Sequence, residues 1–176
     1  MNRKTPYQNL FLFYGALCSA VLLINISVTL LNPTGSISNL DGIIGKIDHG
    51  TLWNTLDPIS NLFYTIGYYC CHQEGAHSLS LNGNQMPICI REIFLLLGMA
   101  VGFLILSTHT VLPAKERFIP CTVLILITPM EWGIEHYLGF SSQAVRAIVS
   151  VITGFAFAGF LSAILEKEYA LLAKKK

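Results

Sequence analysis

Three long apolar runs constrain this chain more than any other feature of its sequence. They cover residues 9–31, 93–112 and 147–165, and none of them contains Asp, Glu, Lys or Arg. A helix needs about 20 apolar residues to cross about 30 Å of hydrocarbon. Each run therefore predicts a membrane-spanning helix.

The composition agrees with a membrane protein. Of the 176 residues, 53% are hydrophobic and only 12% are charged, whereas soluble proteins carry roughly 25% charged residues. The net charge of +1 supplies no basic face to hold phosphates, which excludes nucleic acid as a partner. We expect a single membrane domain, residues 1–176, with the lipid bilayer as its partner.

A fourth span is expected near residues 118–138. Its apolar part, 118–130, is short, so it crosses the bilayer only if the helix continues through Glu131, Glu135 and His136. The predicted fold class is then all-α. It is an integral membrane four-helix bundle with helices near 9–31, 92–112, 118–138 and 145–166. The first run exceeds the roughly 7–15 apolar residues of a signal peptide, so it is expected to be a retained helix.

The basic residues predict the orientation. With four spans, eight Lys and Arg side chains fall on the side of both termini, and three fall on the other. The three are Lys46, Arg91 and Arg146. Because basic residues mark the cytoplasmic side, both termini are predicted to be cytoplasmic and the long segment 32–91 extracytoplasmic.

A short additional helix is expected at residues 58–70. Asp57 suits the N-cap and Pro58 the first helical position, and apolar residues follow at helical spacing. At this length the helix is too short to span, so it is predicted to be interfacial or half-inserted. The stretch that follows, residues 74–85, is predicted to be a loop.

Polar side chains distant in sequence are expected to gather at the extracytoplasmic face. Such groups are costly near a bilayer unless they find partners. Two glutamates, Glu131 and Glu135, share one helix face and are candidates for proton transfer. The candidates for substrate binding are Gln73, Arg91 and Arg146.

Two alternatives remain open for the thiols of this cluster. Cys71, His72 and Cys89 suit a metal site, with zinc as the expected ion, because zinc takes thiolate and imidazole ligands. The spacing matches no standard motif. A Cys71–Cys89 disulfide would serve equally well in an oxidising compartment, and it would exclude thiolate ligation.

The two arginines also have two readings. Arg91 and Arg146 could pair with Glu131, Glu135 or Glu92, locking helices together. They could instead hold an anion such as a lipid phosphate.

A series of motifs resembles the DUF2085 family of small membrane proteins over roughly residues 59–159. The motifs run in order along the chain: Cys71-His72-Gln73, Pro87-Ile88-Cys89-Ile90-Arg91, Thr128-Pro129, Glu131-Trp132-Gly133, Ser141-Ser142, Arg146 and Thr153-Gly154. The resemblance implies the fold and the location of the site. It implies no activity.

This chain departs from the family pattern at several places. Glu92 stands where many relatives have a second cysteine, which puts a mechanism needing that thiol in doubt, although a carboxylate also binds metals. Glu131 and Glu135 stand where the family has Asp and Gln, and His77-Ser78 replaces an Arg-Ser pair.

Three hypotheses for the function follow. The first is a metal-dependent membrane protein acting on a lipidic or small anionic substrate. The second is a non-enzymatic accessory or assembly subunit of a membrane complex, with a Cys71–Cys89 disulfide clasp. The third is a small transporter, which would need to form a homo-oligomer to enclose a path.

Overall fold

The computed structural model describes residues 6–40, 49–108, 113–140 and 142–174. Residues 109–112, the last four expected in the 92–112 helix, lie outside these ranges. So do several residues on which the predicted orientation and the family resemblance draw: Arg3, Lys4, Lys46, Ser141, Lys175 and Lys176.

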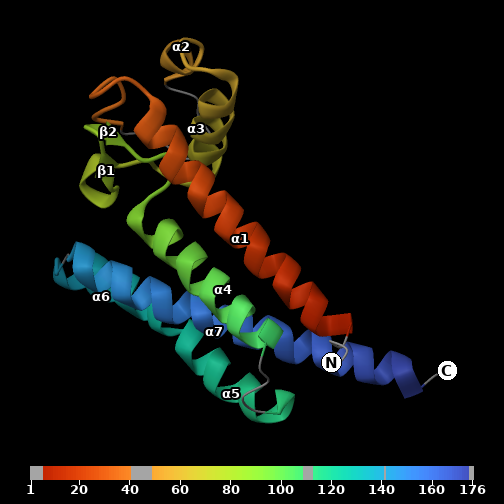
Figure 1. Cartoon of the computed structure of the whole chain (residues 1–176). Coiled ribbons are helices and arrows are strands. Elements are labelled where there is room, and N and C mark those ends of the chain that lie inside the picture. Colours follow the sequence, from red (N-terminus) through yellow and green to blue (C-terminus); the bar gives the residue numbers. More distant parts are fainter. Residues whose placement is uncertain (1–5, 41–48, 109–112, 141, 175–176) are drawn as a thin grey trace. The chain divides into compact units, whose positions relative to one another are not determined.

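Four long apolar helices are present in the described part of the chain, so the predicted fold class is confirmed (Figure 1). They are α1 (Pro6–Leu31), α4 (Ile90–Thr108), α5 (Ala114–Ile125) continued by α6 (Ile127–Leu138), and α7 (Gln143–Lys174). Each supplies a segment long and apolar enough to cross a membrane. The last helix continues well beyond its expected end at 166.

The third candidate span, Ala114–Leu138, includes the polar turns at its end, as predicted, but it is broken once. The break lies at Leu126, between α5 and α6. Pro129 explains it, because proline has no N–H to donate to the carbonyl of Ile125 and its ring crowds that carbonyl. At the break the Leu126 amide donates to the carbonyl of Val123, at 3.2 Å, which is a tighter turn than that of an α-helix.

The chain divides into two compact units. The first consists of Met1–Ala20 with Phe94–Lys176, and the second of Val21–Ile93. The first unit thus holds most of α4, all of α5, α6 and α7, and the start of α1. Whether the whole chain is one membrane domain, as expected, stays a prediction.

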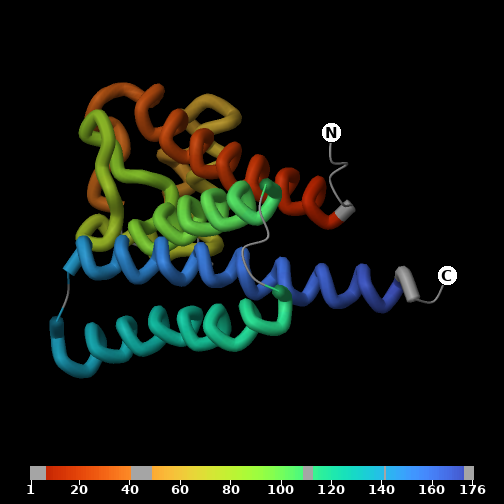
Figure 2. The backbone as a smooth tube through the Cα atoms, turned by 60° about the horizontal axis from the view of Figure 1, so that its bottom comes forward, coloured from red at the N-terminus to blue at the C-terminus, as the bar shows by residue number. Residues whose placement is uncertain are grey.

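The first unit is a helical bundle with an apolar core. Phe11 of α1, Phe103 and Leu106 of α4, and Ala158 of α7 are buried against one another. Figure 2 shows α5 and α6 running alongside α7. Gly98 and Gly154 let α4 and α7 approach closely, since a Cβ at either position would overlap a backbone carbonyl of the other helix.

The second unit contains the end of α1, from Val21 to Leu31. Its elements are α2 (Gly50–Trp53), α3 (Pro58–Cys70), η1 (Gly75–His77), β1 (Ser80–Leu81) and β2 (Asn84–Gln85). Trp53 stacks on Tyr64, with ring centroids 5.2 Å apart, inside a core that includes Val28 and Ile37. The short helix 58–70 is confirmed; its place in the bilayer interface stays a prediction.

The stretch 74–85 is more ordered than the predicted loop. β1 and β2 form an antiparallel hairpin in which Ser80 faces Gln85. Its turn residues, Asn82 and Gly83, have φ values of 52° and 72°. An Asn-Gly pair with both residues at positive φ is the preferred two-residue hairpin turn.

Asp57 caps α3, and we expect its removal to loosen that helix. Its carboxylate accepts from the backbone N–H groups of Ile59 at 3.0 Å and Ser60 at 3.1 Å. Asp57→Ala should cost about 1 kcal/mol of local stability, and Asp57→Asn much less because it keeps the acceptor. Hydrogen–deuterium exchange of the α3 amides in the purified protein measures the difference.

The same cap gives α3 a pH dependence. Hydrogen bonds, first from the Ser60 side chain, hold the pKa of Asp57 below its ordinary value of 3.8. A carboxyl with a lowered folded-state pKa stabilises above its unfolded pKa, and this contribution is lost as the pH falls through the folded-state value. After correction for the slower intrinsic exchange in acid, protection of the α3 amides should fall in the wild type but not in Asp57→Asn; equal acid responses would contradict this role.

Candidate metal centre

Two thiols and a carboxylate meet in the second unit. The Sγ atoms of Cys71 and Cys89 and an oxygen of Glu92 all lie within 4.8 Å of one another. Cys71 is buried, and the other two are half-buried. Cys71 directly follows α3, Cys89 directly precedes α4, and Glu92 lies in the first turn of α4, so the group lies where a candidate membrane span starts.

Gln73 and Gly67 determine how close the two thiol-bearing segments come. The Gln73 side-chain N–H₂ group donates to the carbonyls of Tyr64 in α3, at 3.0 Å, and Pro87, at 2.8 Å. Gly67 packs directly on the Pro87 carbonyl, where any Cβ would overlap the oxygen. The segment that leads into Cys89 is thereby held against α3, next to Cys71.

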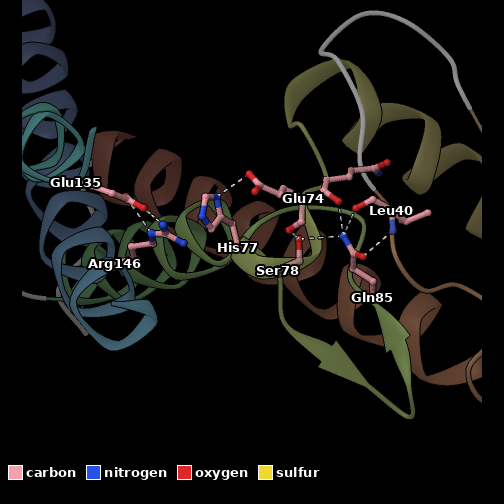
Figure 3. A network of polar contacts seen from close by, with 8 residues as sticks. Leu40, Glu74, His77, Ser78, Gln85, Glu135 and Arg146 are labelled. Carbon is pink, nitrogen blue, oxygen red and sulfur yellow. Dashed lines mark hydrogen bonds and ion pairs between the residues drawn. The ribbon is translucent and has the colours of Figure 1, made fainter. Parts of the chain in front are cut away.

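Gln85 braces this arrangement from the hairpin. Its side-chain oxygen accepts from the Leu40 amide at 3.0 Å, and its nitrogen donates to Ser78 Oγ at 3.2 Å and to the Gln73 carbonyl. Figure 3 shows the Gln85 side chain directed at Leu40 and Ser78. The Tyr64 hydroxyl donates to the Gln85 carbonyl at 2.7 Å, and burial raises the pKa of Tyr64 to about 12.

The two thiols titrate as a pair. The hydrogen bond that Cys89 donates to the Cys71 sulfur holds the pKa of Cys71 below its ordinary value. That same bond, burial and the nearby Glu92 carboxylate raise the pKa of Cys89. The first proton of the pair therefore leaves more readily than that of an ordinary thiol, and the second is held more tightly. A bound cation would have to displace that second proton.

Glu92 also has a structural role. Its Oε2 atom accepts from the backbone N–H of Cys89 at 2.7 Å. A glutamate in the first turn that reaches back to the residue before the helix forms half of a capping box. One carboxylate therefore both caps α4 and faces the two sulfurs.

Of the three residues predicted to bind a metal, Cys71 and Cys89 lie in this group, and their binding of a metal stays a prediction. His72 is exposed and is not part of the group, whose third member is Glu92. Cys71 has an extended backbone, with φ −141° and ψ 148°, and successive side chains of an extended chain point to opposite sides. His72 consequently points away from the side that Cys71 faces.

The five cysteines are free thiols, so the expected Cys71–Cys89 disulfide is not formed in the structure. The proximity of Cys71 and Cys89 suits either metal ligation or oxidation to a disulfide.

The side-chain amide nitrogen of Gln73, which was expected to bind substrate, donates to carbonyl groups within the protein. Arg91 is half-buried in the first turn of α4, between Cys89 and Glu92.

The remaining predicted residues lie in the first unit. Arg146 of α7 is buried and forms an ion pair with Glu135 of α6; Arg146 Nε is 3.1 Å from Glu135 Oε2, and a second contact joins Nη2 to Oε1 (Figure 3). Glu131 lines a groove between the same two helices. The predicted pairing of Arg146 is thus present. That these residues join the thiols in one site stays a prediction, as do the proton-transfer roles of the glutamates.

One buried ion pair escaped prediction. Arg117, counted from sequence as a cytoplasmic charge, is buried and donates to Ser162 Oγ at 2.8 Å and to Glu166. Ser162 and Glu166 are four residues apart on α7, so they share one helix face. A serine and a glutamate at this spacing on an apolar helix were the sequence feature from which a buried partner for an arginine could have been predicted.

The family model described as "Predicted membrane protein (DUF2085)" matches residues 71–161, just over half of the chain. The match begins at Cys71 and includes Cys89 and Glu92. No curated protein and no solved structure matches the chain.

Proposed function

The chain belongs to the DUF2085 family of predicted membrane proteins, and on that premise we propose that it binds a zinc-class metal ion through Cys71, Cys89 and Glu92. The observation that carries the proposal is the approach of three ligating atoms to within 4.8 Å of one another. They come from two segments that Gly67 and Gln73 hold together.

The chemistry of the three groups supports a metal. Thiolates favour zinc and other soft ions, and zinc accepts carboxylate oxygen as well. With metal–sulfur bonds of about 2.3 Å, the ligand atoms of a tetrahedral site lie about 3.8 Å apart. The group in this protein needs only a modest contraction to reach that spacing.

The number of ligands supports a catalytic rather than a structural metal site. Structural zinc sites usually have four protein ligands, whereas catalytic sites have three and keep the fourth position for water. A metal in such a site lowers the pKa of its water and supplies a nucleophile at neutral pH. Three ligands in this protein favour a site of the second kind.

The location suggests the substrate class. The centre adjoins the start of the candidate span Ile90–Thr108, where lipid headgroups meet the protein. Arg91 lies in the same turn as Glu92, and a guanidinium suits phosphate or carboxylate groups. We propose a lipidic or small anionic substrate, with Gln73 positioning the ligands rather than binding the substrate.

Metal titration of the purified full chain in detergent tests the proposal. Cys71→Ser and Cys89→Ser should each weaken zinc binding by at least about tenfold, since even groups that only support metal ligands are worth 10–100-fold. Cys70→Ser is the matched control, because Cys70 is an exposed thiol beside Cys71. Equal losses with Cys70→Ser and Cys71→Ser would contradict the assignment.

Glu92→Gln separates the two roles of Glu92. The amide oxygen can still accept from the Cys89 N–H, so the cap is kept, whereas the negative charge that favours a cation is lost. We expect weaker metal binding at unchanged thermal stability. His72→Ala should leave metal binding as in the wild type, and a loss there would return His72 to the ligand set.

A second candidate function is the structural clasp. The second unit is rich in buried amides that hold its segments together: Asn84, for example, donates to the carbonyls of Thr29 and Asn32 and accepts from the Ile37 amide. A Cys71–Cys89 disulfide would add a covalent link to such a scaffold. This candidate predicts an oxidised pair and no metal.

A further inference from the structure

The two thiols of the candidate metal centre have a second chemistry available to them. The sulfurs of Cys71 and Cys89 lie within 4.8 Å of each other and of a Glu92 oxygen. A metal takes these sulfurs as thiolates, whereas a disulfide bonds them to each other. Ligation and oxidation therefore exclude one another, and a centre of this kind holds its ion only while both thiols stay reduced.

Contacts outside the proposed ligand set keep the two thiols opposed. The Gln73 side-chain amide donates to the carbonyls of Tyr64, at 3.0 Å, and Pro87, at 2.8 Å. The Cys71 backbone amide donates to the Gly67 carbonyl at 2.7 Å. The segments that carry the thiols therefore keep their spacing when an ion leaves. Two sulfurs lie about 3.8 Å apart in a tetrahedral zinc site and about 2.05 Å apart in a disulfide, so each needs to move by only about 0.9 Å.

The two thiols differ in exposure. Cys71 is buried, at 6% exposure, whereas Cys89 is half-buried. Because the oxidation of a cysteine depends on its exposure, Cys89 is the sulfur that a small oxidant reaches first. A sulfenic acid formed there condenses with a nearby thiol to give a disulfide. Cys71 is placed to be that thiol.

We propose that the metal centre assigned above, on which this inference rests, is also a redox switch: a peroxide oxidises Cys71 and Cys89 to a disulfide and releases the ion. The Cys89 thiolate attacks one peroxide oxygen, the O–O bond breaks, and one water leaves with uptake of a proton. The Cys71 thiolate then displaces the hydroxyl of the sulfenic acid, which leaves as a second water with a second proton. The two sulfurs lose two electrons in total, and the peroxide gains them.

Glu92 does not hold the ion once the disulfide has formed. Its carboxylate remains from the proposed ligand set, and its Oε2 atom accepts from the Cys89 backbone N–H at 2.7 Å. Zinc sites in proteins use three or four protein ligands, so one carboxylate is too few. A dithiol reverses the change by thiol–disulfide exchange, in which it becomes a disulfide itself and both thiols return.

Thiol counting and zinc release, measured on the detergent-purified full chain, test the switch. One sample of the reduced protein is kept free of metal, a second is loaded with zinc, and both receive a small excess of hydrogen peroxide. In the metal-free sample the reactive thiols should fall from five to three and return to five with dithiothreitol. In the loaded sample a chromophoric chelator should detect about one equivalent of released zinc per chain.

Two variants assign the sulfurs. Cys70→Ser is the matched control, because Cys70 is an exposed thiol beside Cys71. This variant has one cysteine fewer than the five of the chain, so its reactive thiols should fall from four to two. In Cys89→Ser, which also has four cysteines, all four thiols should stay reactive under the same treatment.

The possible outcomes distinguish a failure of the switch from a failure of the metal centre. If the reduced protein binds no zinc, the metal centre is overturned and the switch with it. If zinc binds and stays bound after peroxide, with five reactive thiols, the switch alone is overturned. A loss of thiols that dithiothreitol does not reverse also overturns the switch, because oxidation has then passed beyond the disulfide. So does a disulfide that contains Cys70.

Discussion

Replacement of Gly154 by leucine is expected to abolish recovery of folded protein. A Cβ at Gly154 would overlap the Leu95 carbonyl oxygen and lie 3.0 Å from the Met99 nitrogen, both of which belong to the α4 backbone. Backbone atoms cannot yield as a flexible side chain does, so the two helices would have to separate. Within a bilayer this contact matters more, because packing rather than the hydrophobic effect drives helix association.

Alanine substitutions of glycine test the same helix contact with a smaller added side chain. Gly154→Ala should lower the free energy of unfolding by about 1–3 kcal/mol, the usual cost of overpacking. Gly133 of α6 is the matched control, because a Cβ there meets nothing within 4 Å. Gly133→Ala should raise stability by up to about 1 kcal/mol through helix propensity. Thermal unfolding in detergent, followed by size-exclusion chromatography, measures both; equal shifts for the two glycines would refute the close α4–α7 contact.

The second large effect is expected at Arg117. Arg117→Leu leaves Glu166, whose side chain is only 15% exposed, without this partner. Breaking a buried ion pair from one side costs about 3–5 kcal/mol, whereas replacing both partners by apolar residues is often neutral. The double change Arg117→Leu with Glu166→Leu should therefore recover most of the stability.

Arg117→Lys refines this prediction. Lysine keeps the charge but cannot reach Ser162 and Glu166 with two parallel donors, so we expect partial stability. The same thermal assay measures the stability of each variant, and the double-mutant cycle gives the coupling energy between Arg117 and Glu166. A double variant that is no better than Arg117→Leu would show that the pair does not act as a unit.

Much of the fold was predictable because long apolar runs and cap residues act locally. The spans follow from run length, and the Asp57-Pro58 pair marked the start of α3. The break at Leu126 was not predicted, although Pro129 encodes it. The hairpin at Asn82-Gly83 was read as a loop because strands of two residues leave no alternating apolar pattern.

The site was predictable in part for similar reasons. Cys71 and Cys89 were expected together, and they are. His72 was grouped with them by adjacency, yet the extended backbone at Cys71 directs neighbouring side chains to opposite sides. Glu92 was considered as a carboxylate that could also bind the metal or pair with an arginine, but it was not placed in the predicted ligand set. Its place three residues after Cys89 suits a capping box, which brings its carboxylate back to Cys89.

Metal content and thiol count, measured together, test the metal centre most directly. Detergent-purified protein is analysed by elemental mass spectrometry, and free thiols are counted after denaturation without reductant. We predict about one equivalent of zinc or a similar ion per chain, and all five cysteines reactive. The absence of metal together with only three reactive thiols, two fewer than the five cysteines of the chain, would contradict the metal centre. If the single variants Cys71→Ser and Cys89→Ser then each showed four reactive thiols, the two missing thiols would be assigned to a Cys71–Cys89 disulfide.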